Sequence, residues 1–89
     1  MIHETVTIIN KLGLHARAAA KFVTTASGFE SSILVKRGNR EVNGKSIMGV
    51  MMLAASQGTE IELIIKGPDA EQAIKGLVEL INDRFGEDQ

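Results

Sequence analysis

The residues best suited to chemistry in this sequence are a histidine and an arginine two positions apart. His15 and Arg17 stand in the stretch KLGLHARAAAKF, between a glycine and a run of alanines. If a helix begins at Ala16, His15 is its N-cap, and the unpaired N–H groups of the first turn collect beside the imidazole. Helix starts of this kind bind anions. The pattern therefore predicts an anion site at His15.

A phosphoryl group is the anion that these side chains suit best. Neutral imidazole is a nucleophile, and a guanidinium binds phosphate oxygens through paired hydrogen bonds. The same groups can hold a carboxylate. Because a helix start contributes only about 0.3–1 kcal/mol to a nearby charge, we expect it to stabilise a transferred group more than to deprotonate the ring of His15. Taken alone, the pair also fits a surface histidine followed by a solvated arginine.

The first half of the chain predicts a strand, a helix and a hairpin. Hydrophobic and polar residues alternate in IHETVTII, as in a half-buried strand. Helical spacing follows over about 16–27, and Gly28 is expected to end that helix. In SSILVKRGNREVNG, a Gly38-Asn39 turn separates two apolar segments, which predicts a hairpin with Ile33 and Val35 facing the core.

The second half predicts a short helix, a strand and a long helix. KSIMGVMMLAASQG has helical spacing with Ser46 as N-cap, although Gly49 weakens such a helix by about 1 kcal/mol. TEIELIIKG alternates as a strand does. In PDAEQAIKGLVELINDRFG, Asp69 and Gln72 fit a capping box. The apolar stripe of this helix is expected at Ile74, Leu77, Val78, Ile81 and Phe85.

The resulting order, β-α-β-β-α-β-α, predicts a single α+β domain over residues 1–89. A two-layer open-faced sandwich, with a four-stranded antiparallel sheet and three helices on one face, buries every apolar face. The other sheet face can remain in water. Its outward positions are expected to be Thr5, Thr7, Glu60, Glu62 and Lys66.

The composition narrows the classes of partner. The net charge is −1 and the only aromatic residues are three phenylalanines, which argues against nucleic acid. There is no cysteine, and no apolar run approaches the length of about 20 residues that spans a bilayer. The N-terminal stretch lacks the features of a secretory signal. We expect a cytoplasmic monomer without membrane insertion.

Two stretches together resemble the HPr family, the histidine-containing phosphocarriers of the bacterial phosphotransferase system. They are LGLHARAAAKF, with its G-[LIM]-H-A-R signature, and NGKSIMGVMML. The resemblance covers nearly the whole chain and includes the order of the elements. It implies that His15 accepts a phosphoryl group on Nδ1 from phospho-enzyme I and passes it to a IIA component. The protein is then a carrier rather than an enzyme, with no cofactor and no metal.

Within this resemblance, Arg17 neutralises and orients the phosphoryl group. The phosphate-binding residues are expected to be Ala16, Arg17 and Ala18. The family's usual proline is replaced here by Ala18, which restores one amide and loosens the first turn. We expect phosphoryl carriage to survive, because alanine is an excellent helix former.

The resemblance also gives Ser46 a second role, as the regulatory site of an HPr kinase/phosphorylase. A phosphate there would add about −1.5 to −2 charges beside a helix start. A patch that contacts partner proteins is expected at Leu14, Ala20, Thr24, Ile47, Met48, Met51 and Met52. Core packing is the alternative for the second helix: we expect it for Ile47 and Met51 and leave it open for Met48 and Met52.

Other functions remain possible at this level. A nitrogen-branch carrier would share the fold and His15 but would regulate metabolism or transport instead of feeding a sugar. A regulatory module of the same fold, phosphorylated only on serine, would lack the histidine. An RNA-binding module would need aromatic residues on its strands, and the predicted strands have none.

Overall fold

The alternating hydrophobic residues build a four-stranded antiparallel sheet in the computed structural model, which describes residues 1–89. The strands are β1 (Ile2–Thr7), β2 (Ser32–Arg37), β3 (Arg40–Asn43) and β4 (Glu60–Lys66). They lie in the order β1-β4-β2-β3, and each neighbouring pair is antiparallel. Alternate side chains of the central strand β4, those of Ile61, Leu63 and Ile65, are all buried, as expected for the core face of a sheet.

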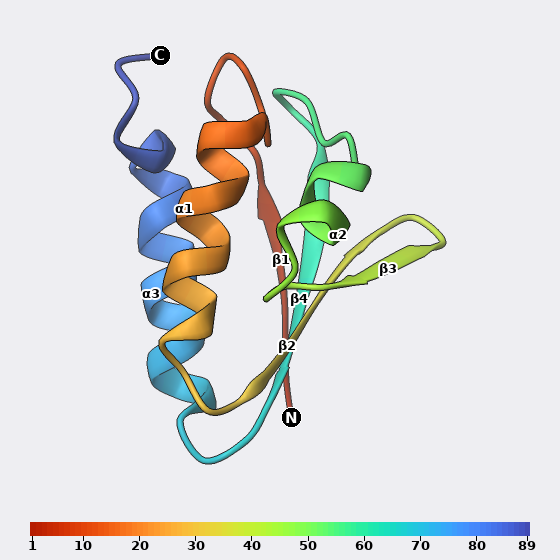
Figure 1. The fold of residues 1–89 in the computed structure, drawn as a ribbon, viewed down its shortest axis with the longest axis vertical. Coiled ribbons are helices and arrows are strands. Elements are labelled where there is room, and N and C mark those ends of the chain that lie inside the picture. The colour runs from red at the N-terminus through yellow and green to blue at the C-terminus, as the bar shows by residue number, and fades with distance from the viewer.

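Three helices cover one face of this sheet. They are α1 (Ala16–Ser27), α2 (Ile47–Met52) and α3 (Ala70–Asn82), and a 3-10 turn, η1 (Arg84–Gly86), follows α3. Figure 1 shows α1 and α3 side by side to the left of the strands, with α2 beside the upper part of α1. The predicted element order and the open-faced sandwich are confirmed, and α1 begins and ends at the predicted residues.

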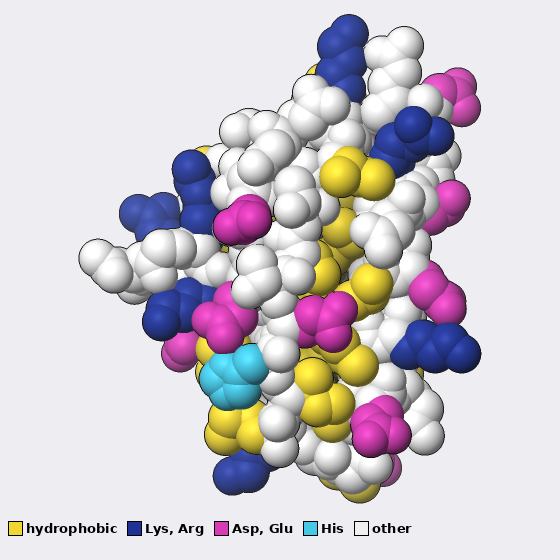
Figure 2. Space-filling model, turned by 180° about the vertical axis from the view of Figure 1, so that it is seen from behind, with side chains coloured by type: hydrophobic (Ala, Val, Ile, Leu, Met, Phe, Trp, Pro, Cys, Tyr) yellow, Lys and Arg dark blue, Asp and Glu magenta, His cyan; other side chains and the backbone are white.

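The core lies between the helices and the sheet. It is one cluster of 19 buried residues, to which the helices contribute Phe22 and Leu77 and the sheet contributes Val35 and Leu63. The opposite sheet face is exposed, and charged side chains are spread over it among hydrophobic ones (Figure 2). The sandwich is therefore open on one side, as the alternating strands predicted.

Helix α2 is short but is capped at both ends. The Ser46 Oγ accepts a hydrogen bond of 3.1 Å from the backbone N–H of Gly49, which confirms the predicted N-cap. At the other end, the guanidinium of Arg37 donates to the carbonyl of Leu53 at 2.8 Å. Side chains of this type satisfy carbonyls that a helix end leaves unpaired. The bond from Arg37, the last residue of β2, fixes the end of α2 to the β2–β3 hairpin.

The capping box predicted at the start of α3 is wrong. Asp69 is the N-cap residue, but its side chain makes no hydrogen bond within the helix. It accepts instead from the backbone N–H groups of Glu30 and Ser31, both at 2.9 Å, and from the Ser31 hydroxyl at 2.5 Å. Three donors from another loop outcompete the helix's own amides, so Asp69 joins α3 to the connection between α1 and β2.

The expected burial of Ile47 and Met51 is also wrong. Their exposed fractions are 41% and 39%, and Met48 and Met52 are exposed further, at 66% and 59%. Val50 is the residue of α2 that enters the core. A helix of six residues has room for only about one inward position per turn. Most of the apolar side chains of α2 are therefore left on the surface.

We predict that Asp69 makes the stability of the fold depend on acid pH. The Ser31 hydroxyl and the neighbouring backbone N–H groups lower the pKa of Asp69 below its ordinary value of 3.8. A carboxylate whose pKa is lower in the folded state stabilises the fold above the unfolded-state pKa and loses that effect as the pH falls. Asp69→Asn should therefore have a lower urea midpoint at pH 7, and the difference from the wild type should shrink below about pH 4.

Glu71→Gln, which removes an exposed carboxylate from the first turn of the same helix, is the matched control. It should leave the urea midpoint nearly unchanged. A difference between the wild type and Asp69→Asn that is equally large at pH 7 and pH 3 would show that the charge of Asp69 is not its source.

Candidate functional site

The loop before α1 is held in place by a glycine that no other residue can replace without strain. Gly13 has φ +67°, and a Cβ atom there would overlap the backbone oxygen of Ala55 and lie 2.8 Å from the Cα of Ser56. The next backbone N–H, that of Leu14, donates to the same Ala55 oxygen at 2.9 Å. This close approach ties the loop to the connection between α2 and β4, and it fixes where His15 lies.

His15 occupies the predicted N-cap of α1. Its backbone is extended, and its carbonyl accepts the first helical hydrogen bond, from Ala19 at 2.8 Å. Its side chain makes no capping bond, so the ring is available for other contacts. The N–H groups of Ala16, Arg17 and Ala18 belong to the first turn, where the α-helix offers no acceptors. The residues predicted to form the anion site thus lie together at one helix end.

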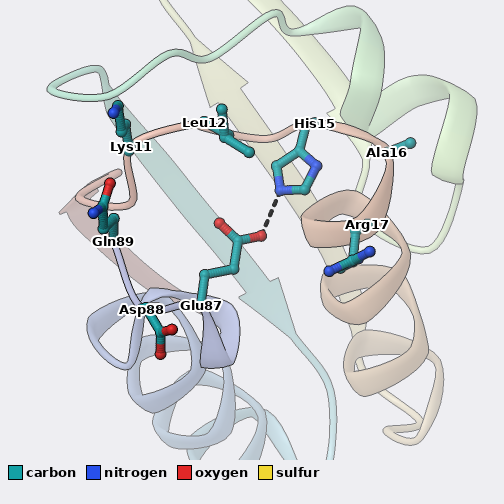
Figure 3. A pocket seen from close by; sticks show the side chains of 8 residues that line it. All are labelled: Lys11, Leu12, His15, Ala16, Arg17, Glu87, Asp88 and Gln89. Atoms are coloured by element: carbon teal, nitrogen blue, oxygen red, sulfur yellow. Dashed lines mark hydrogen bonds and ion pairs between the residues drawn. The ribbon is translucent and has the colours of Figure 1, made fainter.

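A pocket opens beside the imidazole. Figure 3 shows side chains from the loop, from the first turn of α1 and from the segment after α3 around it. Two of the lining side chains are positively charged and two are negatively charged. The lining residues are Lys11, Leu12, His15, Ala16, Arg17, Glu87, Asp88 and Gln89.

One nitrogen of the imidazole is already engaged. His15 donates a hydrogen bond from Nε2 to Oε2 of Glu87, and the exposed fractions of the two side chains are 29% and 14%. Nε2 lies on the side of the ring that faces Glu87, and Nδ1, the second ring nitrogen, lies on the side of Ala16 (Figure 3). Nδ1 is therefore the nitrogen that remains open at the start of α1.

Glu87 is itself held by a buried amide. The Nδ2 of Asn10 donates to Oε1 of Glu87 at 3.0 Å and to the carbonyl of Gly13 at 2.8 Å. This hydrogen bond from Asn10, together with the bond from His15 and the positive charge of Lys21, holds the pKa of Glu87 below its usual range. Glu87 is consequently a carboxylate at neutral pH, with both oxygens accepting hydrogen bonds.

The turn η1 delivers Glu87 to this position. Arg84, Phe85 and Gly86 have successive φ values of +56°, +55° and +76°. This left-handed run reverses the direction of the chain after α3. The side chain of Phe85 is fully buried, and its carbonyl accepts from the Nζ of Lys21 at 2.6 Å. An anchored turn of this kind places the residues after it against α1.

The residues of the predicted contact patch differ in exposure. Leu14 is 5% exposed and belongs to the core, so its expected place in the patch is wrong: the loop conformation at Gly13 turns its side chain inward. Ala20 is half-buried and Thr24 is exposed on α1. Helix α2 lies against α1 and exposes four of its five apolar side chains, Ile47, Met48, Met51 and Met52.

Sequence reasoning missed Asn10 and Glu87. They are 5 and 72 positions from His15, and no spacing rule relates a helix N-cap to a turn at the far end of another helix. One signal was available: Gly86 follows an apolar residue at the end of the long helix, a pattern typical of a chain reversal. That pattern predicts a turn but not its target.

The structure contains neither a metal-binding cluster nor a membrane-spanning helix. No group of three or more His, Asp or Glu side chains is arranged to hold a metal ion. The protein also has no helix with the length and apolar character that crossing a membrane requires.

Comparison with known proteins identifies the family. Residues 2–83 match the family model described as "PTS HPr component phosphorylation site". The phosphocarrier protein HPr of Neisseria meningitidis is 55% identical over 87 residues, which cover 98% of each chain. A crystal structure of HPr from Thermoanaerobacter tengcongensis superposes with a TM-score of 0.96 at 54% identity, covering all of both chains. A crystal structure of an HPr dimer from the same organism gives a TM-score of 0.79 at 55% identity, covering 98% of this chain and all of that one. The chain belongs to the HPr family of phosphocarrier proteins of the phosphotransferase system.

Proposed function

We propose that His15 is the residue that carries the phosphoryl group, on Nδ1, between phospho-enzyme I and a IIA component. One observation carries this proposal: Glu87 engages Nε2, while Nδ1 is open at the start of α1. A ring nitrogen that keeps its lone pair is the nucleophile that phosphoryl transfer requires. Membership of the HPr family supports phosphoryl transfer as the reaction, and the contact between Nε2 and Glu87 supports Nδ1 as the reacting atom.

The proposed reaction needs no cofactor and no metal. As Nδ1 forms a bond to phosphorus, the bond between phosphorus and the donor atom of phospho-enzyme I breaks. Arg17 and the N–H groups of Ala16 and Ala18 bind the phosphoryl oxygens, where charge is spread in the transition state. Onward transfer to the IIA component is the same step in reverse. The protein is thus a carrier that is phosphorylated by one partner and dephosphorylated by the next. We expect both steps to take place in the cytoplasm.

The direct test is phosphorylation by enzyme I and phosphoenolpyruvate. Wild type should gain the mass of one phosphoryl group, and that gain should be lost in acid, as expected for a phosphoramidate. His15→Ala should gain nothing, while His3→Ala, the matched control at the other histidine, should behave as the wild type does. Labelling of His15→Ala, or an acid-stable product in the wild type, would contradict the proposal.

The branch of the system is a separate question. Phosphorylated wild type, offered side by side to a sugar-type IIA and a nitrogen-type IIA, should transfer its phosphoryl group faster to one of them. KSIMGVM resembles the sugar-type carriers, whereas KLGLHARAA and KGPDAEQA resemble the nitrogen branch, so the sequence leaves both acceptors open. Faster transfer to the sugar-type acceptor would assign the chain to the sugar branch. Faster transfer to the nitrogen-type acceptor would assign the chain to the regulatory branch.

Ser46 is proposed as a regulatory phosphorylation site, and its position supports this role. It is half-buried at the N-cap of α2, beside the exposed apolar side chains of that helix. A phosphate there would place negative charge next to the surface that meets partner proteins. HPr kinase/phosphorylase with ATP should modify the wild type and spare Ser46→Ala. Equal labelling of both proteins would place the modification elsewhere.

The exposed apolar side chains of α2, with Thr24 and Ala20 of α1, are proposed as the contact surface for enzyme I and the IIA component. Methionine suits a surface that adapts to several partners. We also propose that the protein is a monomer when it meets them, although a relative has been crystallised as a dimer. Sedimentation at micromolar concentration should give the mass of one chain, 9.6 kDa. A mass twice as large would refute the monomer.

A further inference from the structure

Residues 84–89, which follow α3, form a strap that passes beside the imidazole of His15. Phe85 anchors it in the core, Lys21 holds its carbonyl, and the left-handed run at residues 84–86 turns the chain back toward α1. The strap lies beyond residues 2–83, the part that the family model matches. Glu87, whose side chain contacts His15, therefore lies outside the part of the chain that the family model describes.

The position of the Glu87 carboxylate is determined by a second contact. Asn10 is fully buried, and its Nδ2 lies between two acceptors, the carbonyl of Gly13 and Oε1 of Glu87. The opposite orientation of the amide would set oxygen against oxygen at both contacts, so the orientation of Asn10 is fixed. The other carboxylate oxygen then faces Nε2 of His15. A carboxylate can only accept a hydrogen bond, so Nε2 must carry the proton.

We propose that Glu87 is a positioning residue for phosphoryl transfer, which acts by holding the proton on Nε2 of His15. This inference rests on the proposed function of His15. With the proton on Nε2, the lone pair stays on Nδ1, in the direction of the helix start and Arg17. Carboxylates that orient a histidine and stabilise its cationic form are a recurring device in catalysis.

The charge balance of the step explains why the carboxylate matters in both directions. When Nδ1 attacks phosphorus, the bond from phosphorus to the donor atom breaks, and the ring becomes cationic because Nε2 keeps its proton. Glu87 stabilises that cation. When the phosphoryl group moves on, the Nδ1–P bond breaks and the ring leaves as neutral imidazole, with its proton still on Nε2. No base has to remove a proton at either step.

Two measurements on Glu87→Gln test this role, with Asp83→Asn as the matched control. Asp83 is an exposed carboxylate between α3 and η1 that does not line the pocket, so the control removes the same charge nearby. Wild type and Asp83→Asn should show a downfield, slowly exchanging Nε2–H proton in NMR spectra, assigned by its absence in His15→Ala. Glu87→Gln should lose that signal. Its rate of phosphorylation by enzyme I should fall about tenfold, the typical cost of one charge-assisted hydrogen bond.

These experiments can refute the proposed role of Glu87 and the proposed role of His15 independently. The NMR comparison uses unphosphorylated protein, so it tests Glu87 even if wild type accepts no phosphoryl group, a result that would refute the proposed function. An unchanged transfer rate in Glu87→Gln overturns the positioning role. A reduced rate with the Nε2–H signal intact overturns the proton-holding mechanism. An equal loss of rate in Asp83→Asn would reduce the effect to net charge and overturn both.

Discussion

Arg17→Ala should slow phosphoryl transfer to His15 by about a hundredfold, the usual effect of removing one donor that meets developing charge. Arg17 is exposed, lines the pocket beside the imidazole, and forms neither of the two ion pairs in the structure. Its guanidinium is therefore free to bind the phosphoryl oxygens. For the same reason, the urea midpoint of the variant should equal that of the wild type. Single-turnover transfer from phospho-enzyme I measures the effect.

Two further variants show which property of Arg17 is used. Arg17→Lys keeps the charge but loses the planar pair of donors, so its rate should lie between those of the wild type and Arg17→Ala. Lys75→Ala removes an exposed positive charge from α3, away from the pocket, and should transfer as the wild type does. Transfer by Arg17→Ala at the wild-type rate would exclude Arg17 from the site.

Gly13→Ala should destabilise the fold by about 3 kcal/mol, through the combined cost of a left-handed alanine and an overpacked contact. The new methyl group would overlap the backbone of Ala55 and Ser56, which cannot move aside as a side chain could. Relief of this overlap would also shift the loop that ends at His15. The urea unfolding midpoint measures the first effect, and the phosphorylation rate measures the second.

Gly38→Ala separates the two costs of the Gly13 substitution. Gly38 has a similar φ of +58°, but a Cβ atom there would meet nothing within 4 Å. This control should therefore lose only about 1 kcal/mol, the cost of the left-handed conformation, and should keep its transfer rate. If both variants lost the same stability, the close approach of Gly13 to Ala55 would have no energetic weight.

The fold was predictable because its signals are local and agree with one another. Alternation along IHETVTII and TEIELIIKG predicts strands β1 and β4, and the 3.6-residue spacing after Gly13 predicts α1 at its observed bounds. The Gly38-Asn39 turn between two apolar segments predicts the β2–β3 hairpin. Each element contains its own pattern, and only one layered arrangement buries all of the apolar faces.

The wrong predictions concern which side chains are buried and which side chains bind one another, because both depend on the tertiary arrangement. Asp69 had the right type and position for a capping box, but donors 38 and 39 residues away bind it instead. Ile47 and Met51 had helical spacing, but a helix of six residues covers too little of the core to bury them. For this reason, intrinsic patterns predict elements more reliably than they predict which side chains meet.

The candidate site also contains residues that are close in sequence, which could be predicted together, and one distant residue, which could not. His15, Arg17 and the start of α1 are close in sequence, so the local pattern was sufficient to predict that they lie together at a helix end, while the binding of an anion there stays a prediction. Glu87 reaches His15 only because three successive left-handed residues redirect the chain, and non-glycine residues rarely adopt that conformation. The position of Gly86 predicts a turn after the long helix, but no local pattern predicts that this turn brings Glu87 to His15.

The most direct test of this account is to identify the ring nitrogen that is phosphorylated. Wild type labelled with ¹⁵N in histidine, after reaction with enzyme I and phosphoenolpyruvate, should show phosphorus coupled to Nδ1 of His15 and a proton retained on Nε2. Phosphorus bonded to Nε2 would contradict the account, because the observed contact with Glu87 would then have to break before transfer. A phosphoryl group found only on Ser46 would refute the carrier role of His15 itself.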